Sequence, residues 1–222
     1  MRLLLLGATG RTGKELLAQA LRRGHQVTAF VRTPTKLRAT EGLTVVRGEL
    51  RHPTALAAAL VGHDAVLSAL GPAPREAFRP STLLTDCMRT TLEAMNMAGV
   101  RRLGVVSAAV LFPERGLYFA FFRWLLREHA RDLRGMEQLV RESPLDFTLA
   151  RPPRLVVRPE LGFEALSGAL PAGSRSMSFA AVAAFLLDSV ERSIHLGEVV
   201  GLGPARAASR QLPRAERAGS AS

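Results

Sequence analysis

The segment Gly7–Gly13 constrains the fold of this chain more than any other stretch. Its sequence is GATGRTG, and it stands between the apolar run Leu3–Leu6 and the amphipathic run Lys14–Leu21. A buried strand, a glycine turn and a helix in this order bring unpaired N–H groups and the positive end of a helix dipole to one point. The sequence therefore predicts a phosphate-binding turn that joins the first strand to the first helix.

The spacing of the glycines separates two kinds of phosphate site. They fall as G-x-x-G-x-x-G, whereas the dinucleotide fingerprint is usually G-x-G-x-x-G and a P-loop ends in G-K-[ST]. Glu15 stands where a P-loop needs a magnesium-binding hydroxyl, which excludes that alternative. Gly7 is expected to allow the sharp turn, Gly10 the close approach of a pyrophosphate, and Gly13 the close packing of helix on sheet. A glycine turn without a ligand is the remaining alternative.

Length and cysteine content set the class of protein. A chain of 222 residues suffices for one α/β domain with a large core. The single cysteine, Cys87, excludes an intramolecular disulfide and favours a reducing compartment. The run Leu3–Leu6 is too short for a signal-peptide core, and no run reaches the roughly 18 apolar residues of a membrane span. We therefore expect a cytoplasmic protein.

The net charge of +11 comes almost wholly from arginine. A basic surface favours anionic ligands. The arginines are scattered through the chain and no nucleic-acid-binding motif accompanies them, so a specific nucleic-acid partner is not expected.

The end of the second expected strand, Gln26–Val31, bears on the choice of cofactor. A site for NAD would place an acidic residue here to hold the ribose hydroxyls. This chain instead has Arg32 and Lys36, whose charges suit a 2′-phosphate. The pattern favours NADP(H) over NAD(H), with a solvated loop arginine as the alternative for Arg32.

Strand and helix patterns alternate along the rest of the chain. Strands are expected at 2–6, 26–31, 43–46, 65–70, 103–106, 146–150, 176–178 and 198–202, and helices at 11–23, 53–60, 81–98 (capped by Ser81), 131–142 and 179–192. This alternation predicts a doubly wound parallel sheet with helices on both faces, a three-layer α/β/α single domain. The domain is expected to cover 1–202, and the Ala-, Arg- and Ser-rich residues 203–222 to form a disordered basic tail.

An aromatic stretch at 117–126 interrupts the alternation. It contains Tyr118, Phe119, Phe121, Phe122 and Trp124. Three interpretations remain open: a core helix, one wall of a pocket for an aromatic substrate, and a surface patch for a membrane or a homodimer.

The remaining titratable residues suggest structural roles. Acidic residues mix with arginines at helical spacing and predict a salt-bridged face: Glu128, Asp132, Glu137 and Glu142. Cys87, in the middle of a predicted helix, is expected in the core rather than as a nucleophile. The five histidines show no metal-ligand spacing, so no metal site is expected.

Several motifs together resemble one family. GATGRTG, VRTP followed by Lys36, Gly48-Glu49-Leu50, Ser107 and the DFTLARPP of 146–153 are similar to the atypical short-chain dehydrogenase/reductases of the NAD(P)H-binding, NmrA-like group. Within that group the pattern is most similar to the biliverdin IXβ reductases, also called flavin reductases. The resemblance covers residues 1 to about 202 and implies a Rossmann-type fold.

The resemblance also implies which residues contact the cofactor. They are Thr9, Gly10, Arg11 and Thr12 in the turn, Arg32 and Lys36 at the 2′-phosphate, Glu49 and Leu50 beside the adenine, and Leu70, Gly71, Ser107, Pro152, Pro153 and Arg154 towards the nicotinamide. Arg154 replaces the histidine of the flavin reductases. An arginine cannot shuttle protons at neutral pH, although it can attract an anionic substrate. Ser107 and Arg154 are the candidate catalytic residues.

The chain lacks the Tyr-x-x-x-Lys pair that usual short-chain dehydrogenases use for proton transfer. Its one tyrosine is Tyr118, position 122 is Phe, and its two lysines, Lys14 and Lys36, flank the predicted nucleotide site. We therefore expect hydride transfer from NADPH to a small flat acceptor, such as a flavin or quinone, that takes protons from solvent. Alternatives are an NADP(H) sensor without turnover and, less favoured, a sugar or isoflavone-type reductase.

Overall fold

The structure, a computed structural model, describes residues 1–72, 79–112 and 125–205. Within them the main sheet has the order β3-β2-β1-β4-β5-β6-β10-β8. The parallel strands are β1 (Arg2–Leu6), β2 (Gln26–Val31), β3 (Leu43–Arg47), β4 (Ala65–Ser68), β5 (Arg102–Val106), β6 (Asp146–Arg151) and β10 (Glu198–Pro204). The edge strand β8 (Phe163–Ser167) runs antiparallel to β10, and β7 (Arg154–Val156) pairs with β9 (Ser176–Ser178) apart from this sheet.

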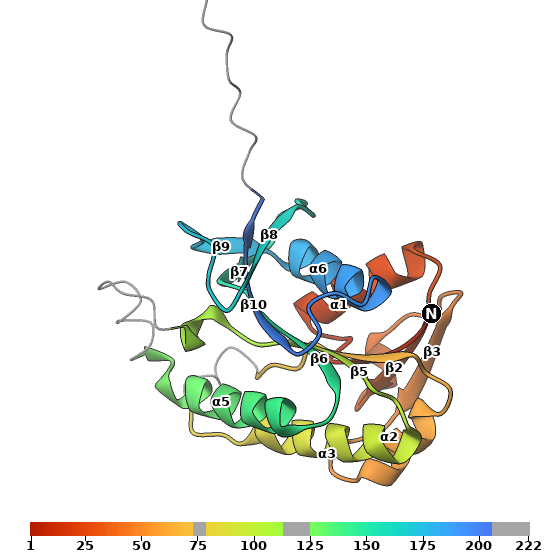
Figure 1. Cartoon of the computed structure of the whole chain (residues 1–222). Helices are drawn as coiled ribbons and strands as arrows, with labels where there is room; N and C mark the ends of the chain where they lie inside the picture. The colour runs from red at the N-terminus through yellow and green to blue at the C-terminus, as the bar shows by residue number, and fades with distance from the viewer. Residues whose placement is uncertain (73–78, 113–124, 206–222) are drawn as a thin grey trace, which may run out of the picture.

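Helices cover both faces of the sheet, which gives the three layers that the sequence predicts (Figure 1). On one face α1 (Arg11–Arg22) lies beside α6 (Phe179–Glu191); on the other lie α2 (Pro53–Leu60), α3 (Leu83–Ala98) and α5 (Arg127–Glu142). Two short 3-10 turns, η1 (Pro34–Lys36) and η2 (Ala109–Leu111), follow β2 and β5. No helix in the described part of the chain combines the length and apolarity needed to cross a bilayer.

The leucine run of β1 explains why this strand lies at the centre. Leu3 and Leu5 belong to the core beneath α1 and α6, whereas Leu4 and Leu6 belong to the core beneath α2, α3 and α5. A parallel strand that is buried on both faces needs apolar residues at every position. Four leucines in succession therefore predict a central strand.

The order of the strands fixes where a ligand can bind. β1 and β4 are neighbours, and the chain winds outward from them in opposite directions. In such sheets ligands bind in the crevice at the carboxyl ends of the strands, at this switch point. Gly7 follows β1 directly at that edge, and Ser107 follows β5 at the same edge.

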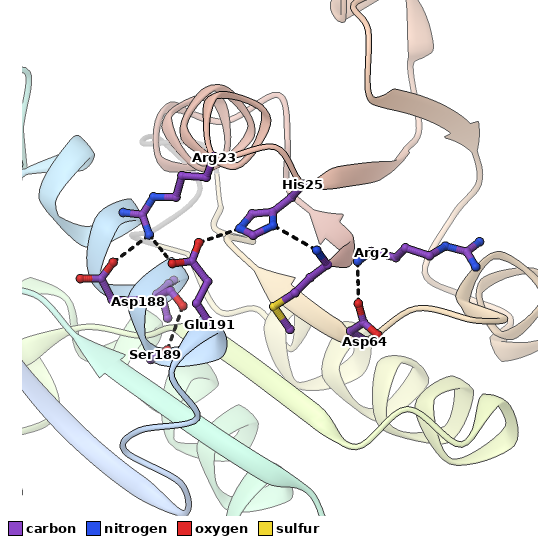
Figure 2. A network of polar contacts seen from close by, with 9 residues as sticks. Arg2, Arg23, His25, Asp64, Asp188, Ser189 and Glu191 are labelled. Carbon is purple, nitrogen blue, oxygen red and sulfur yellow. Dashed lines mark hydrogen bonds and ion pairs between the residues drawn. The ribbon is translucent and has the colours of Figure 1, made fainter.

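A polar network joins α1 to α6 at the opposite edge of the sheet (Figure 2). Arg23 donates to Asp188 (2.7 Å) and Glu191 (2.9 Å), and His25 Nε2 lies 2.6 Å from Glu191. These contacts lie near the amino ends of the strands, because His25 immediately precedes β2. The network therefore stabilises helix packing away from the ligand crevice.

Three boundaries of strands and helices differ from those that the sequence predicts. β4 ends at Ser68 rather than at 70, and α5 begins at Arg127 rather than at 131. α3 begins at Leu83 instead of at Ser81, because the Ser81 hydroxyl accepts from the Leu83 N–H (3.0 Å) in a turn that precedes the helix.

The C-terminal part of the sheet extends further than predicted. β10 continues to Pro204, two residues beyond the expected end of the domain, because Gly203 and Pro204 pair with β8. β8 itself was missed, since FEALS is a partly exposed edge strand without a clear alternation. β7 was also missed. The rest of the expected tail, residues 206–222, lies outside the described residues.

The first turn of α3 is capped by a residue of another helix. The N-cap residue, Thr82, donates its hydroxyl to Asp86 (2.7 Å). The backbone N–H groups of Leu84 and Thr85 instead donate to the carboxylate of Asp132 on α5 (3.0 and 2.9 Å). The predicted ion pairs with arginines form at Glu128 and Glu137, whereas Asp132 serves as this cap. Asp132 and Glu137 are buried, at 5% and 3% exposed.

We expect Asp132→Ala to lower the free energy of unfolding by about 2 kcal/mol, because it removes a buried helix cap. Urea unfolding measures the change. Glu142→Ala is the matched control, since Glu142 is an exposed carboxylate on the same helix. If both variants lose the same stability, the cap has no special role.

Candidate functional site

A pocket of about 750 Å³ lies at the carboxyl ends of β1 to β4. Its walls come from the glycine turn, from the segments that follow β2, β3 and β4, and from one side of α3. The lining residues are Gly7, Thr9, Gly10, Phe30, Val31, Arg32, Thr33, Lys36, Gly48, Glu49, Leu50, Arg51, Ala69, Leu70, Gly71, Leu83, Leu84, Asp86, Cys87, Arg89 and Thr90. Segments far apart in sequence therefore meet at the predicted nucleotide site.

Backbone contacts require two of the three glycines in the turn. Gly7 has φ +78°, and a Cβ on it would lie 2.5 Å from the carbonyl oxygen of Ala69. A Cβ on Gly13 would lie 2.0 Å from the carbonyl oxygen of Gly7. For Gly10 the nearest such contact is 3.3 Å, so the fold itself requires this glycine least.

Exposed cations dominate the polar groups of the pocket. Among its described lining residues, Arg32, Lys36, Arg51 and Arg89 are cationic, and two side chains, those of Glu49 and Asp86, are acidic. Arg51 lies 3.4 Å from Glu49, with both side chains mostly exposed. The excess of positive charge favours an anionic ligand.

Cys87 forms part of the wall instead of lying in the core as predicted. Its side chain is half-buried on the side of α3 that lines the pocket. Burial raises the pKa of the Cys87 thiol, Asp86 raises it further, and the nearby Arg32 lowers it. The thiol is therefore neutral at pH 7 and a poor nucleophile.

Sequence reasoning missed the contribution of α3 to this pocket. Asp86, Arg89 and Thr90 lie more than 50 residues from the glycine turn, and only the packing of α3 brings them to it. Gly48, which also lines the pocket, is required by local packing, since a Cβ there would lie 2.0 Å from the ring of Phe30. No local pattern in the sequence marks the α3 residues.

A second polar cluster lies at the same edge of the sheet, where the carboxyl ends of β5 and β6 meet α5. Ser107 Oγ donates to Glu137 Oε1 (2.6 Å), and Arg151 donates to Oε1 and Oε2 of Glu137 (2.9 and 2.6 Å). All three residues are less than 10% exposed. The Arg151 guanidinium lies over the ring of Phe112, 4.6 Å from its centroid. Ser107, a predicted site residue, lies in this cluster and not among the pocket-lining residues.

The other predicted site residues lie outside the pocket wall. Arg11 lies over the ring of Phe179 (4.7 Å), at the start of α6. Thr12 and Gly13 are buried in α1, Pro152 accepts from the Ala109 N–H (2.8 Å), Pro153 is half-buried and Arg154 is exposed at the start of β7. Their cofactor contacts stay predictions.

Two further predictions concern the metal and the aromatic stretch. In the parts of the chain that the structure describes, no three His, Cys, Asp or Glu side chains gather to hold a metal ion. Residues 113–124, which include Tyr118 and the other aromatic residues of the 117–126 stretch, lie outside the described residues. The role of that stretch stays a prediction.

Comparison with known proteins adds a family match. The NAD(P)H-binding family matches residues 7–193. Photosystem II assembly factor Ycf39 of Guillardia theta is 26% identical over 156 residues, which make up 67% of this chain and 45% of the relative. The chain spans less than half the length of the curated relatives it matches.

Solved structures share the fold over nearly the whole chain. A short-chain dehydrogenase/reductase of Veillonella parvula in complex with NADP has a TM-score of 0.78 at 22% identity, covering 91% of this chain and 94% of that one. A candidate NADH-flavin reductase of Streptococcus pneumoniae has a TM-score of 0.72 at 22% identity, covering 92% and 100%. The Rossmann-type fold predicted from the sequence is confirmed.

Proposed function

Because this chain belongs to the NAD(P)H-binding family, we propose that it is an NADPH-dependent reductase that transfers hydride to a flat acceptor, such as a flavin or quinone. The observation that carries the proposal is the pocket, in which a glycine turn, a helix N-terminus and four cations meet. This combination suits a dinucleotide with an extra phosphate.

The pocket matches the adenosine half of such a cofactor. The diphosphate lies at Gly10 and the first turn of α1, where backbone N–H groups can donate to it. Glu49 and Leu50 flank the adenine, and Arg32 and Lys36 bind the 2′-phosphate. Arg89, from the side of α3 that lines the pocket, adds a further cation to its wall.

The nicotinamide half extends towards β5 and β6. Leu70 and Gly71, which line the pocket after β4, allow the cofactor to pass close to the backbone. Ser107 and the Arg-Pro-Pro segment of 151–153 follow the next two strands of the sheet. A dinucleotide spans the switch point of a doubly wound sheet in this manner.

Hydride transfer to such an acceptor needs little acid–base catalysis from the protein. The bound cofactor supplies the hydride, and the chain orients the two rings and excludes water. The single tyrosine and the two lysines of the sequence provide no Tyr-x-x-x-Lys pair. An acceptor that takes its protons from solvent suits a site of this kind.

Arg32→Ala tests the cofactor preference. We expect about a tenfold loss of affinity for NADPH and no change for NADH, because the variant removes one charged partner of the 2′-phosphate. Calorimetry with both cofactors measures the ratio of the two dissociation constants. Arg38→Ala is the matched control, since Arg38 is an exposed arginine nearby in sequence that does not line the pocket. An unchanged ratio in Arg32→Ala would mean that the phosphate is held elsewhere.

A second candidate function is an NADP(H)-binding sensor or regulator without turnover. Arg154 in place of a histidine favours it, and one curated relative is named as an assembly factor. NADPH oxidation with FMN, riboflavin and a quinone separates the two functions. Tight NADPH binding without turnover across these acceptors would contradict the reductase and favour the sensor.

A further inference from the structure

Ser107 has used both of its hydrogen-bond donors inside the protein. Its backbone N–H donates to the carbonyl oxygen of Ala150 (2.7 Å), and its hydroxyl donates to Glu137 Oε1 (2.6 Å). A carboxylate can only accept hydrogen bonds, so the direction of the second bond is fixed. Ser107 can therefore offer a ligand only the lone pairs of its oxygen.

Arg151 holds the carboxylate of Glu137 in place beside Ser107. Its Nε and Nη2 bind the two carboxylate oxygens at 2.9 and 2.6 Å, and Arg141 Nη2 lies 3.5 Å from Oε2. Glu137 is 3% exposed, so these guanidinium groups take the place of water at its carboxylate oxygens. A serine that is needed only for its small size would not require a buried ion pair beside its hydroxyl.

The proposed function places the nicotinamide beside this cluster. The pocket that we assign to the adenosine half has walls from the segments that follow β2 and β3, so the residues that would hold the other half follow β4, β5 and β6. The nicotinamide carries a carboxamide, whose N–H₂ group is a donor. This N–H₂ group can donate a hydrogen bond to an acceptor that follows β5, such as the Ser107 hydroxyl.

We propose that Glu137 and Arg151 are positioning residues that fix Ser107 as a hydrogen-bond acceptor for the carboxamide N–H₂ of the nicotinamide. This inference rests on the proposed function. It makes the β5 end of the crevice selective for a ligand with a donor at that position. A ligand with only a carbonyl or carboxylate there meets lone pairs instead of a donor.

The test compares NADPH with the reduced 3-acetylpyridine analogue of NADPH, in which a methyl group replaces the N–H₂ of the carboxamide. Calorimetry without any acceptor gives both dissociation constants, so turnover is not needed. Binding of 2′,5′-ADP reports separately on the adenosine half. The wild-type chain is expected to bind NADPH about tenfold more tightly than the analogue.

Two variants identify the cause of this discrimination. In Ser107→Ala the acceptor is gone, and in the double variant Glu137→Met/Arg151→Met no carboxylate accepts from the hydroxyl, so the ratio of the two dissociation constants should fall to about twofold or less in both. Glu142→Met, which removes a carboxylate at an exposed position of α5, should keep the tenfold ratio. All variants should bind 2′,5′-ADP as the wild type does.

The outcomes separate this inference from the proposed function. A wild-type chain that binds neither NADPH nor 2′,5′-ADP overturns the function itself. Equal affinity for NADPH and the analogue overturns the inference alone, as does a tenfold ratio that survives in Ser107→Ala or in the double variant. The double variant is preferred to Glu137→Gln because it buries no unpaired charge, whereas the amide oxygen of a glutamine could still accept from the Ser107 hydroxyl.

Discussion

Gly13→Ala is expected to lower the free energy of unfolding by about 3 kcal/mol and to abolish measurable NADPH binding. The added Cβ would lie 2.0 Å from the carbonyl oxygen of Gly7 and 2.8 Å from the Cα of Ala8. Both are backbone atoms, so no side-chain rotation can relieve the contact. The helix α1 must move away from the turn, which displaces the N–H groups that we assign to the diphosphate.

Two other glycines give graded controls for this prediction. Gly71→Ala should change stability by less than about 0.5 kcal/mol, because among the described residues no atom beyond its chain neighbours would lie within 4 Å of a Cβ at this position. Gly10→Ala should keep the fold, since its nearest contact is 3.3 Å, yet weaken NADPH binding where the methyl group meets the pyrophosphate. Urea unfolding and calorimetry measure the two effects. A Gly13→Ala protein of wild-type stability would contradict the close packing, and a Gly10→Ala protein of wild-type affinity would contradict the position of the diphosphate.

The sequence predicts the centre of this fold well because the constraints there are local. The run Leu3–Leu6 is buried on both faces, the positive φ of Gly7 is a local requirement, and Gly13 packs against the carbonyl of Gly7 only six residues earlier. The alternation of strands and helices then limits the topology, since parallel connections are right-handed and short. The strand order follows from these rules with few alternatives.

The periphery of the site depends on contacts between distant residues. Arg89 and Asp86 reach the pocket only because α3 packs beside it, and no short sequence pattern encodes that packing. The acidic residues at helical spacing on α5 predict a salt-bridged face, yet Asp132 caps α3 and Glu137 also binds Ser107. Spacing along a helix identifies a face, but it does not identify what the face contacts.

Glu137→Ala is expected to destabilise the fold by about 4 kcal/mol, because it leaves the guanidinium of Arg151 buried without its carboxylate. Arg151 is 9% exposed, so water can replace the lost partner only in part. Urea unfolding measures the loss, and Glu142→Ala, exposed on the same helix, should lose less than about 1 kcal/mol.

The double variant Glu137→Met/Arg151→Met distinguishes a stabilising ion pair from one retained for function. Replacing a buried ion pair by apolar groups of similar volume is often neutral or stabilising, so the double variant should recover most of what Glu137→Ala loses. Recovery of stability together with loss of discrimination between NADPH and its acetylpyridine analogue would show that the pair serves Ser107 and not the fold. A double variant as unstable as Glu137→Ala would instead mean that the pair is needed for folding, and the buried charge would then require no ligand to explain it.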